Sequence, residues 1–190
     1  MKRTSLILTL ICLLIVFAGC RSRQPKATQY YLIEYPEGNN ELVSDTIPEI
    51  PLALEILPVI VYPSFATHRI AIRENTHEIR YFLHHQWAVR PEEALTRFVY
   101  HFLTRQRMFA QVSARFWDVE PDLQFHTNIY QLEVVKLHRK YFARLSLTFQ
   151  LTDTKSGVIL TEHKSEIQIE LARRNLNLFA SETLEIFRFL

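Results

Sequence analysis

The chain has 190 residues, 48% of them hydrophobic, and it carries 22 basic and 20 acidic side chains. This length supplies one hydrophobic core and a single domain. Two of the basic residues, Lys2 and Arg3, lie in a predicted leader, so the mature chain lacks the positive surplus that nucleic-acid binding requires. We therefore expect no nucleic-acid partner.

The N-terminus has the pattern of an export signal. Lys2 and Arg3 precede an apolar run from Leu6 to Ala18 that only Thr9 interrupts. A signal-peptide core needs about 7–15 apolar residues, whereas a membrane span needs about 20, so the run favours export over a permanent anchor. We therefore assign residues 1–19 to a signal peptide.

A cysteine follows this run directly. The exit sequence from Phe17 to Cys20 resembles the bacterial lipobox, in which small residues precede a cysteine that becomes lipidated. The resemblance implies a lipoprotein signal peptide, cleavage before Cys20, and acylation of Cys20, palmitate included. The alternative is an ordinary signal peptide or an uncleaved helix, with Cys20 incidental. Residues 20–29 are polar and are interpreted as the lipidated N-terminus and a tether of about 30 Å reach.

The first strands are predicted from apolar segments. The segment from Tyr30 to Tyr35 is apolar on nearly both sides, which predicts a strand covered on both faces. Leu52 to Val61 predicts the next strand, in which Pro58 implies an edge position or a bulge. Two alternating segments then flank a polar turn and predict a hairpin, with Trp87 at its exit. Its expected buried face holds Ile70, Ile72, Ile79, Tyr81 and Leu83.

A helix is predicted from Pro91, because proline suits the first helical position. Its apolar stripe holds Leu95, Phe98, Val99, Phe102 and Leu103. A final helix is predicted from a second stripe, which holds Leu176, Phe179, Thr183, Ile186, Phe187 and Leu190. Both stripes must pack on a sheet.

Further strands are predicted between the two helices. They comprise 108–116, 123–137, 141–152 and a return strand after a hairpin loop at Asp153 to Gly157. In the third of them Leu147 and Phe149 lie on one face and Thr148 on the other, so we expect their burial to differ. The simplest assembly is a single α+β domain over residues 30–190, a largely antiparallel β-sheet packed against two α-helices.

The sequence offers little catalytic chemistry. His84 and His85 are neighbours in a predicted strand and point to opposite faces, so they cannot chelate one ion together. The mature chain has no Gly-x-Ser-x-Gly turn and only two glycines, Gly38 and Gly157. We expect no enzyme activity, no metal and no cofactor.

The central stretch carries a family resemblance. Its order is Arg-Ile-Ala-x-Arg from Arg69 to Arg73, a strand ending in Trp87-Ala88, a helix from Pro91, and Phe-x-x-Val from Phe109. This order resembles the auxiliary lipoproteins of ABC transport systems that work beside periplasmic MCE (mammalian cell entry) proteins. The resemblance implies an accessory role in transporting envelope lipids or other hydrophobic compounds, with an MCE-type protein and its ABC transporter as partners.

The sequence also offers candidate residues for a partner interface and for the choice of membrane. Interface candidates are Arg69, Arg73 and Trp87 on the hairpin, and Phe179 and Ile186 on the final helix. The alternative places Trp87 in the core and both arginines on a solvated face. By resemblance to lipoprotein sorting, Arg21 implies the outer membrane, facing the periplasm, in preference to the inner membrane.

Two other classes of function stay open, together with self-association. One is an unrecognised periplasmic enzyme. The other is a lipoprotein regulator of a different envelope machine, such as cell-wall synthesis. A homo-oligomer is compatible with each of these readings.

Overall fold

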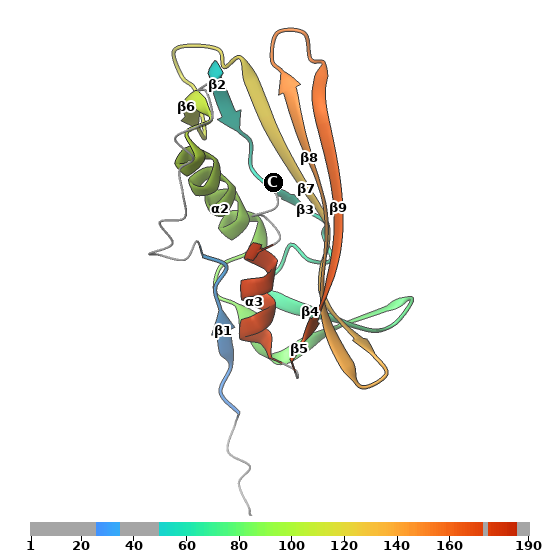
Figure 1. Ribbon diagram of the computed structural model, residues 1–190. Coiled ribbons are helices and arrows are strands. Elements are labelled where there is room, and N and C mark those ends of the chain that lie inside the picture. The colour runs from blue at the N-terminus through green and yellow to red at the C-terminus, as the bar shows by residue number, and fades with distance from the viewer. Residues whose placement is uncertain (1–25, 35–49, 173–174, 186–190) are drawn as a thin grey trace, which may run out of the picture.

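The computed structural model describes residues 26–34, 50–172 and 175–185 (Figure 1). Its strands are β1 (Gln29–Tyr31), β2 (Ile50–Ile56), β3 (Ile60–Val61), β4 (Arg69–Asn75), β5 (Glu78–Trp87), β6 (Phe109–Ser113), β7 (Leu123–Leu137), β8 (Lys140–Asp153) and β9 (Ile159–Leu171). Its helices are α2 (Pro91–Gln106) and α3 (Leu176–Glu185). The predicted single α+β domain is confirmed, whereas the predictions for Cys20, Arg21 and Ile186 lie outside the described residues.

The described strands form one mixed sheet organised around β7. One edge of β7 pairs along its whole length with β8, and β8 continues to β9, all antiparallel. The other edge of β7 pairs in turn with β2, β3 and β4, all parallel. The longest ladders are thus antiparallel, as predicted, and short parallel pairings complete the sheet, including β1 with β5 and β2 with β6.

Both helices cover the same side of this sheet (Figure 1). Helix α2 begins at Pro91 and ends at Gln106, and the residue that caps it, Arg107, has a left-handed φ of 50°. Its predicted stripe is buried in full, and α3 buries Leu176, Phe179, Ala180 and Thr183. The core therefore lies between the helices and the inner face of the sheet, where apolar burial supplies the main stabilisation.

The predicted difference in burial within β8 is wrong. Leu147 and Phe149 are buried, but Thr148 is also only 3% exposed. It lies in the middle strand of the long ladder, opposite Asn128 on β7 and Lys164 on β9. Long side chains on neighbouring strands can cover a small residue on the outer face, and alternation within one strand does not reveal this.

The predicted inward face of β5 is wrong at its centre. Arg69 pairs with Gln86 and Ala71 with Tyr81, so four β5 residues lie opposite the single residue Ile70. This bulge changes which face the side chains take. Phe82 is consequently buried, and Leu83 is 79% exposed.

Three other strand predictions differ from the structure in exposure, continuity or length. The segment from Tyr30 is not covered on both faces, because β1 is an edge strand and Tyr30 is 65% exposed. The single strand predicted from Leu52 to Val61, with Pro58 at an edge position or a bulge, is two strands in the structure, because Pro58 lies in the gap between β2 and β3. The strand predicted at 108–116 is shorter in the structure, as β6 (Phe109–Ser113).

Candidate functional site

Trp87 and Phe179 belong to the core, so their prediction as interface residues is wrong. They are 2% and 1% exposed. Their ring centroids lie 5.4 Å apart with the rings tilted by 38°. The Trp87 backbone N–H also donates to the His68 carbonyl oxygen at 2.7 Å. The pair joins the exit of the central hairpin to the final helix, which is the core alternative considered for Trp87.

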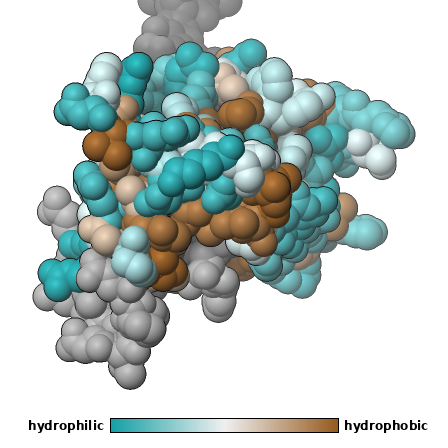
Figure 2. Space-filling view, turned by 90° about the horizontal axis from the view of Figure 1, so that it is seen from above, coloured by the Kyte–Doolittle hydropathy of each residue, from teal (hydrophilic) through white to brown (hydrophobic). Residues whose placement is uncertain are grey.

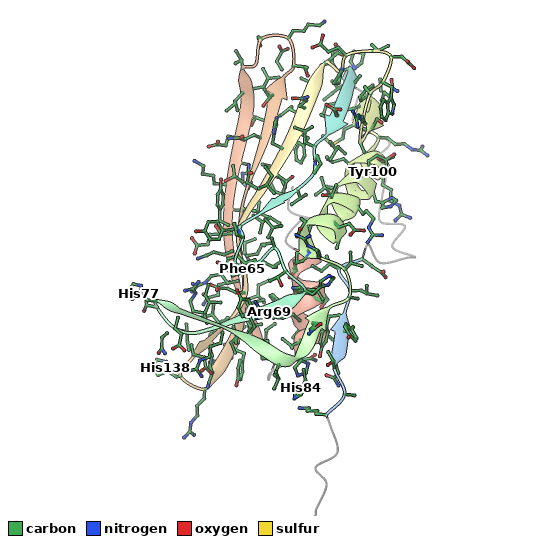
Figure 3. The ribbon with its side chains drawn as sticks, turned by 180° about the vertical axis from the view of Figure 1, so that it is seen from behind. Phe65, Arg69, His77, His84, Tyr100 and His138 are labelled. Atoms are coloured by element: carbon green, nitrogen blue, oxygen red, sulfur yellow. The ribbon has the colours of Figure 1, made fainter. Side chains whose placement is uncertain are left out.

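Arg69 stays on the surface. Its guanidinium lies 4.1 Å from the centre of the Tyr81 ring, a cation–π arrangement. The Tyr81 hydroxyl in turn donates to the Ser64 carbonyl oxygen at 3.0 Å. Figure 3 places Arg69 and Phe65 on neighbouring parts of the domain. Arg69 is therefore accessible to a partner, in an orientation that Tyr81 restrains.

Arg73 has a buried partner that the sequence did not indicate. Its Nε donates to Glu133 Oε1 at 2.8 Å, and its Nη1 donates to the Thr76 carbonyl oxygen at 3.0 Å. Glu133, on β7, has a side chain that is 0% exposed. A second cation, Arg144 Nη1 on β8, lies 3.9 Å from the same oxygen. Arg73 and Arg144 thus converge on one buried carboxylate, which we call the arginine–glutamate triad.

The triad borders a hollow of about 890 Å³. The hollow lies between the β4–β5 hairpin and the β7–β8 strands, and Figure 3 marks the two hairpin tips by His77 and His138. Its lining comprises Arg73, Glu74, Asn75, Thr76, His77, Glu78, Gln131, Val135, Lys136, Leu137 and Arg144. A hydrogen bond from Lys136 holds the pKa of Glu74 below its usual value. The polar groups stand beside an apolar strip from β7.

Exposed apolar side chains gather at the end of the domain opposite the place where the described chain begins (Figure 1). Trp117 is 78% exposed and Val119 is 71% exposed on the β6–β7 loop. Val158, Ile159 and Leu160 are each more than half exposed on the β8–β9 hairpin. Figure 2 looks onto this end and shows hydrophobic residues among hydrophilic ones. We call these five residues the apolar end.

The two loops of the apolar end are joined. The Thr154 backbone N–H donates to the Asp122 carbonyl oxygen at 3.0 Å, and Arg115 lies 4.1 Å above the Trp117 ring. The consecutive apolar residues after Gly157 are the sequence signal that could have located this surface. Exposed apolar groups of this kind mark interaction sites more often than scattered single residues do.

One histidine of the β5 bulge, His85, makes a structural hydrogen bond. His85 Nδ1 shares a hydrogen bond of 2.9 Å with the Tyr31 hydroxyl, which ties β1 to β5. Burial raises the pKa of Tyr31. Across the described ranges, no three His, Cys, Asp or Glu side chains are placed to hold a metal ion. Neither described helix is long and apolar enough to cross a membrane.

Comparison with known protein families gives one match to the chain. The family of ABC-type transport auxiliary lipoprotein components matches residues 31–179. This chain belongs to that family. The match covers the central hairpin, both sides of the long ladder and the start of α3, and it confirms the resemblance found in the sequence. A search of curated proteins found no match.

Two solved structures share the fold. A crystal structure of a Xanthomonas campestris protein aligns with a TM-score of 0.65 at 11% identity, covering 84% of each chain. An uncharacterized protein aligns with a TM-score of 0.63 at 10% identity, covering 84% of this chain and 91% of that one. At such identities the likeness supports the fold alone.

Proposed function

We propose that this auxiliary lipoprotein is a non-catalytic, lipid-anchored subunit that contacts an MCE-type periplasmic protein of its ABC transport system. The family assignment supplies the association with an ABC transport system. The observation that carries the contact is the apolar end, where five large apolar side chains are exposed on two joined loops. The substrate class is an envelope lipid or another hydrophobic compound.

The position of the apolar end fits this role. The described chain begins at Lys26, near the lower end of the domain in Figure 1, and the apolar end lies at the top. A lipid on Cys20 and a tether of about 30 Å would hold the lower end toward the membrane and leave the apolar end facing away. A protein projecting from the opposite membrane would meet that end first. Arg21 supports the outer membrane as the anchored side.

The anchor makes the first testable prediction. Cys20→Ala should abolish incorporation of radiolabelled palmitate, because no other mature residue is a cysteine. It should also move the protein out of the outer-membrane fraction of a density gradient. The matched control is Cys12→Ala, which changes a cysteine inside the leader and should leave both readouts intact. Palmitate labelling that survives Cys20→Ala would contradict the anchor.

The proposed contact at the apolar end makes the second testable prediction. The double variant Trp117→Asp with Val119→Asp places two charges on the apolar end and should lower co-purification with the MCE protein by about tenfold or more, since exposed aromatic anchors dominate interface energies. The matched control is Leu83→Asp, which charges an apolar side chain of similar exposure on β5. Equal co-purification of both variants would place the contact elsewhere. Capture of a cell-wall synthesis enzyme instead would favour the regulator.

A further inference from the structure

The arginine–glutamate triad has hydrogen-bonding capacity that the fold does not use. Glu133 Oε2 is a buried acceptor without a hydrogen-bond partner among the described residues, so the capacity that an anion could use is that of the arginine donors. Arg73 donates hydrogen bonds through Nε and Nη1. Arg144 donates through Nε and Nη2, and both of these bonds go to Gln168 Oε1. The remaining nitrogens, Arg73 Nη2 and Arg144 Nη1, make no hydrogen bond to a described residue. Both guanidinium groups line the hollow.

The surrounding structure fixes these arginines in place. The Arg73 side chain is only 19% exposed and that of Arg144 only 23%. Each donates hydrogen bonds to an acceptor on another strand, Arg73 to Glu133 and Arg144 to Gln168, so neither must give up much side-chain freedom to bind a ligand. Glu133 is fully covered, and its charge offsets one of the two arginines. One guanidinium is enough to pair with the Glu133 carboxylate. The second guanidinium therefore leaves a net positive charge at the triad.

The other charges around the hollow largely neutralise one another. Glu74 pairs with Lys136 at 2.8 Å. Glu78 pairs with Arg80 at 2.7 Å. The excess cation is therefore localised at the triad, where each guanidinium keeps one nitrogen without a hydrogen bond to a described residue. Guanidinium pairs are well suited to phosphate, whose several oxygens can accept from both at once.

We propose that this hollow binds a phosphate group through Arg73 and Arg144, with Glu133 orienting the two guanidiniums from beneath. The phosphate comes from a lipid headgroup or from free phosphate. Leu137, which is 44% exposed, lines the same hollow beside the triad and supplies an apolar surface for an acyl chain. The site is independent of the partner contact, because its residues are separate from the apolar end.

The test titrates the full chain, held in nanodiscs of neutral lipid, with inorganic phosphate at constant ionic strength. Binding is followed by NMR shifts of the arginine side-chain N–H groups. Arg144→Gln should weaken phosphate binding about tenfold or more, because charge-assisted hydrogen bonds are the strong ones. The matched control is Arg97→Gln on α2, an exposed arginine paired with Glu93, which should leave affinity unchanged.

A second variant guards against misfolding. Arg73→Gln combined with Glu133→Gln removes a cation and an anion together, so it keeps the net charge of the triad and leaves no buried carboxylate unpaired, and it should also lose phosphate binding. Absence of phosphate binding by the unmodified chain would overturn the proposal. So would retention of full affinity in Arg144→Gln or in the double variant, because either arginine would then be dispensable.

The source of the phosphate is distinguished by two further probes. Dihexanoyl phosphatidic acid carries the group on short acyl chains, and dihexanoylglycerol carries the chains alone. A lipid site predicts that the phosphatidic acid binds at least about tenfold more tightly than inorganic phosphate, because its acyl chains contact Leu137. A free-phosphate site predicts equal affinities. Equal binding of dihexanoylglycerol and the phosphatidic acid would overturn the proposal, since phosphate would then contribute nothing.

Discussion

Replacing Trp87 with alanine is expected to lower the free energy of unfolding by about 3–5 kcal/mol. Its side chain is 2% exposed, and it packs on Phe179 of α3 with ring centroids 5.4 Å apart. The truncation removes buried apolar area and leaves a cavity where β5 meets the final helix. Urea denaturation of the chain lacking residues 1–20 measures this loss.

Trp117→Ala is the matched control for the same amino acid. Trp117 is 78% exposed, so its loss should change the unfolding free energy by less than about 0.5 kcal/mol. Phe179→Ala and the double variant with Trp87→Ala then measure the coupling between the two rings. Equal losses for Trp87→Ala and Trp117→Ala would contradict the core position of Trp87.

Arg73→Ala is expected to destabilise the domain by about 3 kcal/mol. The change leaves Glu133 buried without its close partner, since Arg144 Nη1 is 3.9 Å away, whereas Arg73 Nε is 2.8 Å away. A buried, unpaired carboxylate is costly because it has lost its hydration. Urea denaturation at neutral pH measures the change.

Two companion variants separate the buried charge from lost packing. Glu133→Gln in the Arg73→Ala background should restore part of the stability, because an amide is less costly to bury than a carboxylate. Arg80→Ala breaks an exposed pair with Glu78 and should change stability by less than about 1 kcal/mol. No rescue by Glu133→Gln would show that the loss has another cause.

Residue patterns in the sequence predicted the helices, strands and turns that depend only on neighbouring residues in the chain. Pro91 and the stripe from Leu95 to Leu103 defined α2, because a helix buries residues at three- and four-residue spacing. The long segment between two turns, Leu123 to Leu137, predicted β7 with its observed ends. Gly157, with a φ of 67°, takes the left-handed position expected for it in the hairpin loop.

Features that depend on distant neighbours could not be predicted in this way. The bulge that buries Phe82 and exposes Leu83 arises from pairing with β4 and β1. Thr148 is covered by strands that only the fold brings beside it. Alternation allowed Glu133 to face solvent, and only the parallel pairing of β4 with β7 brings Arg73 next to it.

The candidate interaction surfaces were also predicted only where local sequence patterns were sufficient. Arg69 was predicted from its motif and does lie on the surface, whereas Trp87 and Phe179 were predicted for the same interface and are buried. An aromatic residue at a hairpin exit suits a core and an interface equally well, so composition could not decide. The apolar end was missed because β7 and β8 separate its two loops in the sequence, and the fold brings them together where the Thr154 N–H meets the Asp122 carbonyl oxygen.

Site-specific photocrosslinking in intact cells tests the proposed contact most directly. A photoreactive amino acid replaces Trp117 at the apolar end or, as the control, Arg97 on the exposed face of α2. The account predicts a covalent adduct between position 117 and the MCE-type protein of the same transport system, and no such adduct from position 97. Adducts from position 117 with a cell-wall synthesis enzyme, or with no MCE-type protein at all, would contradict it.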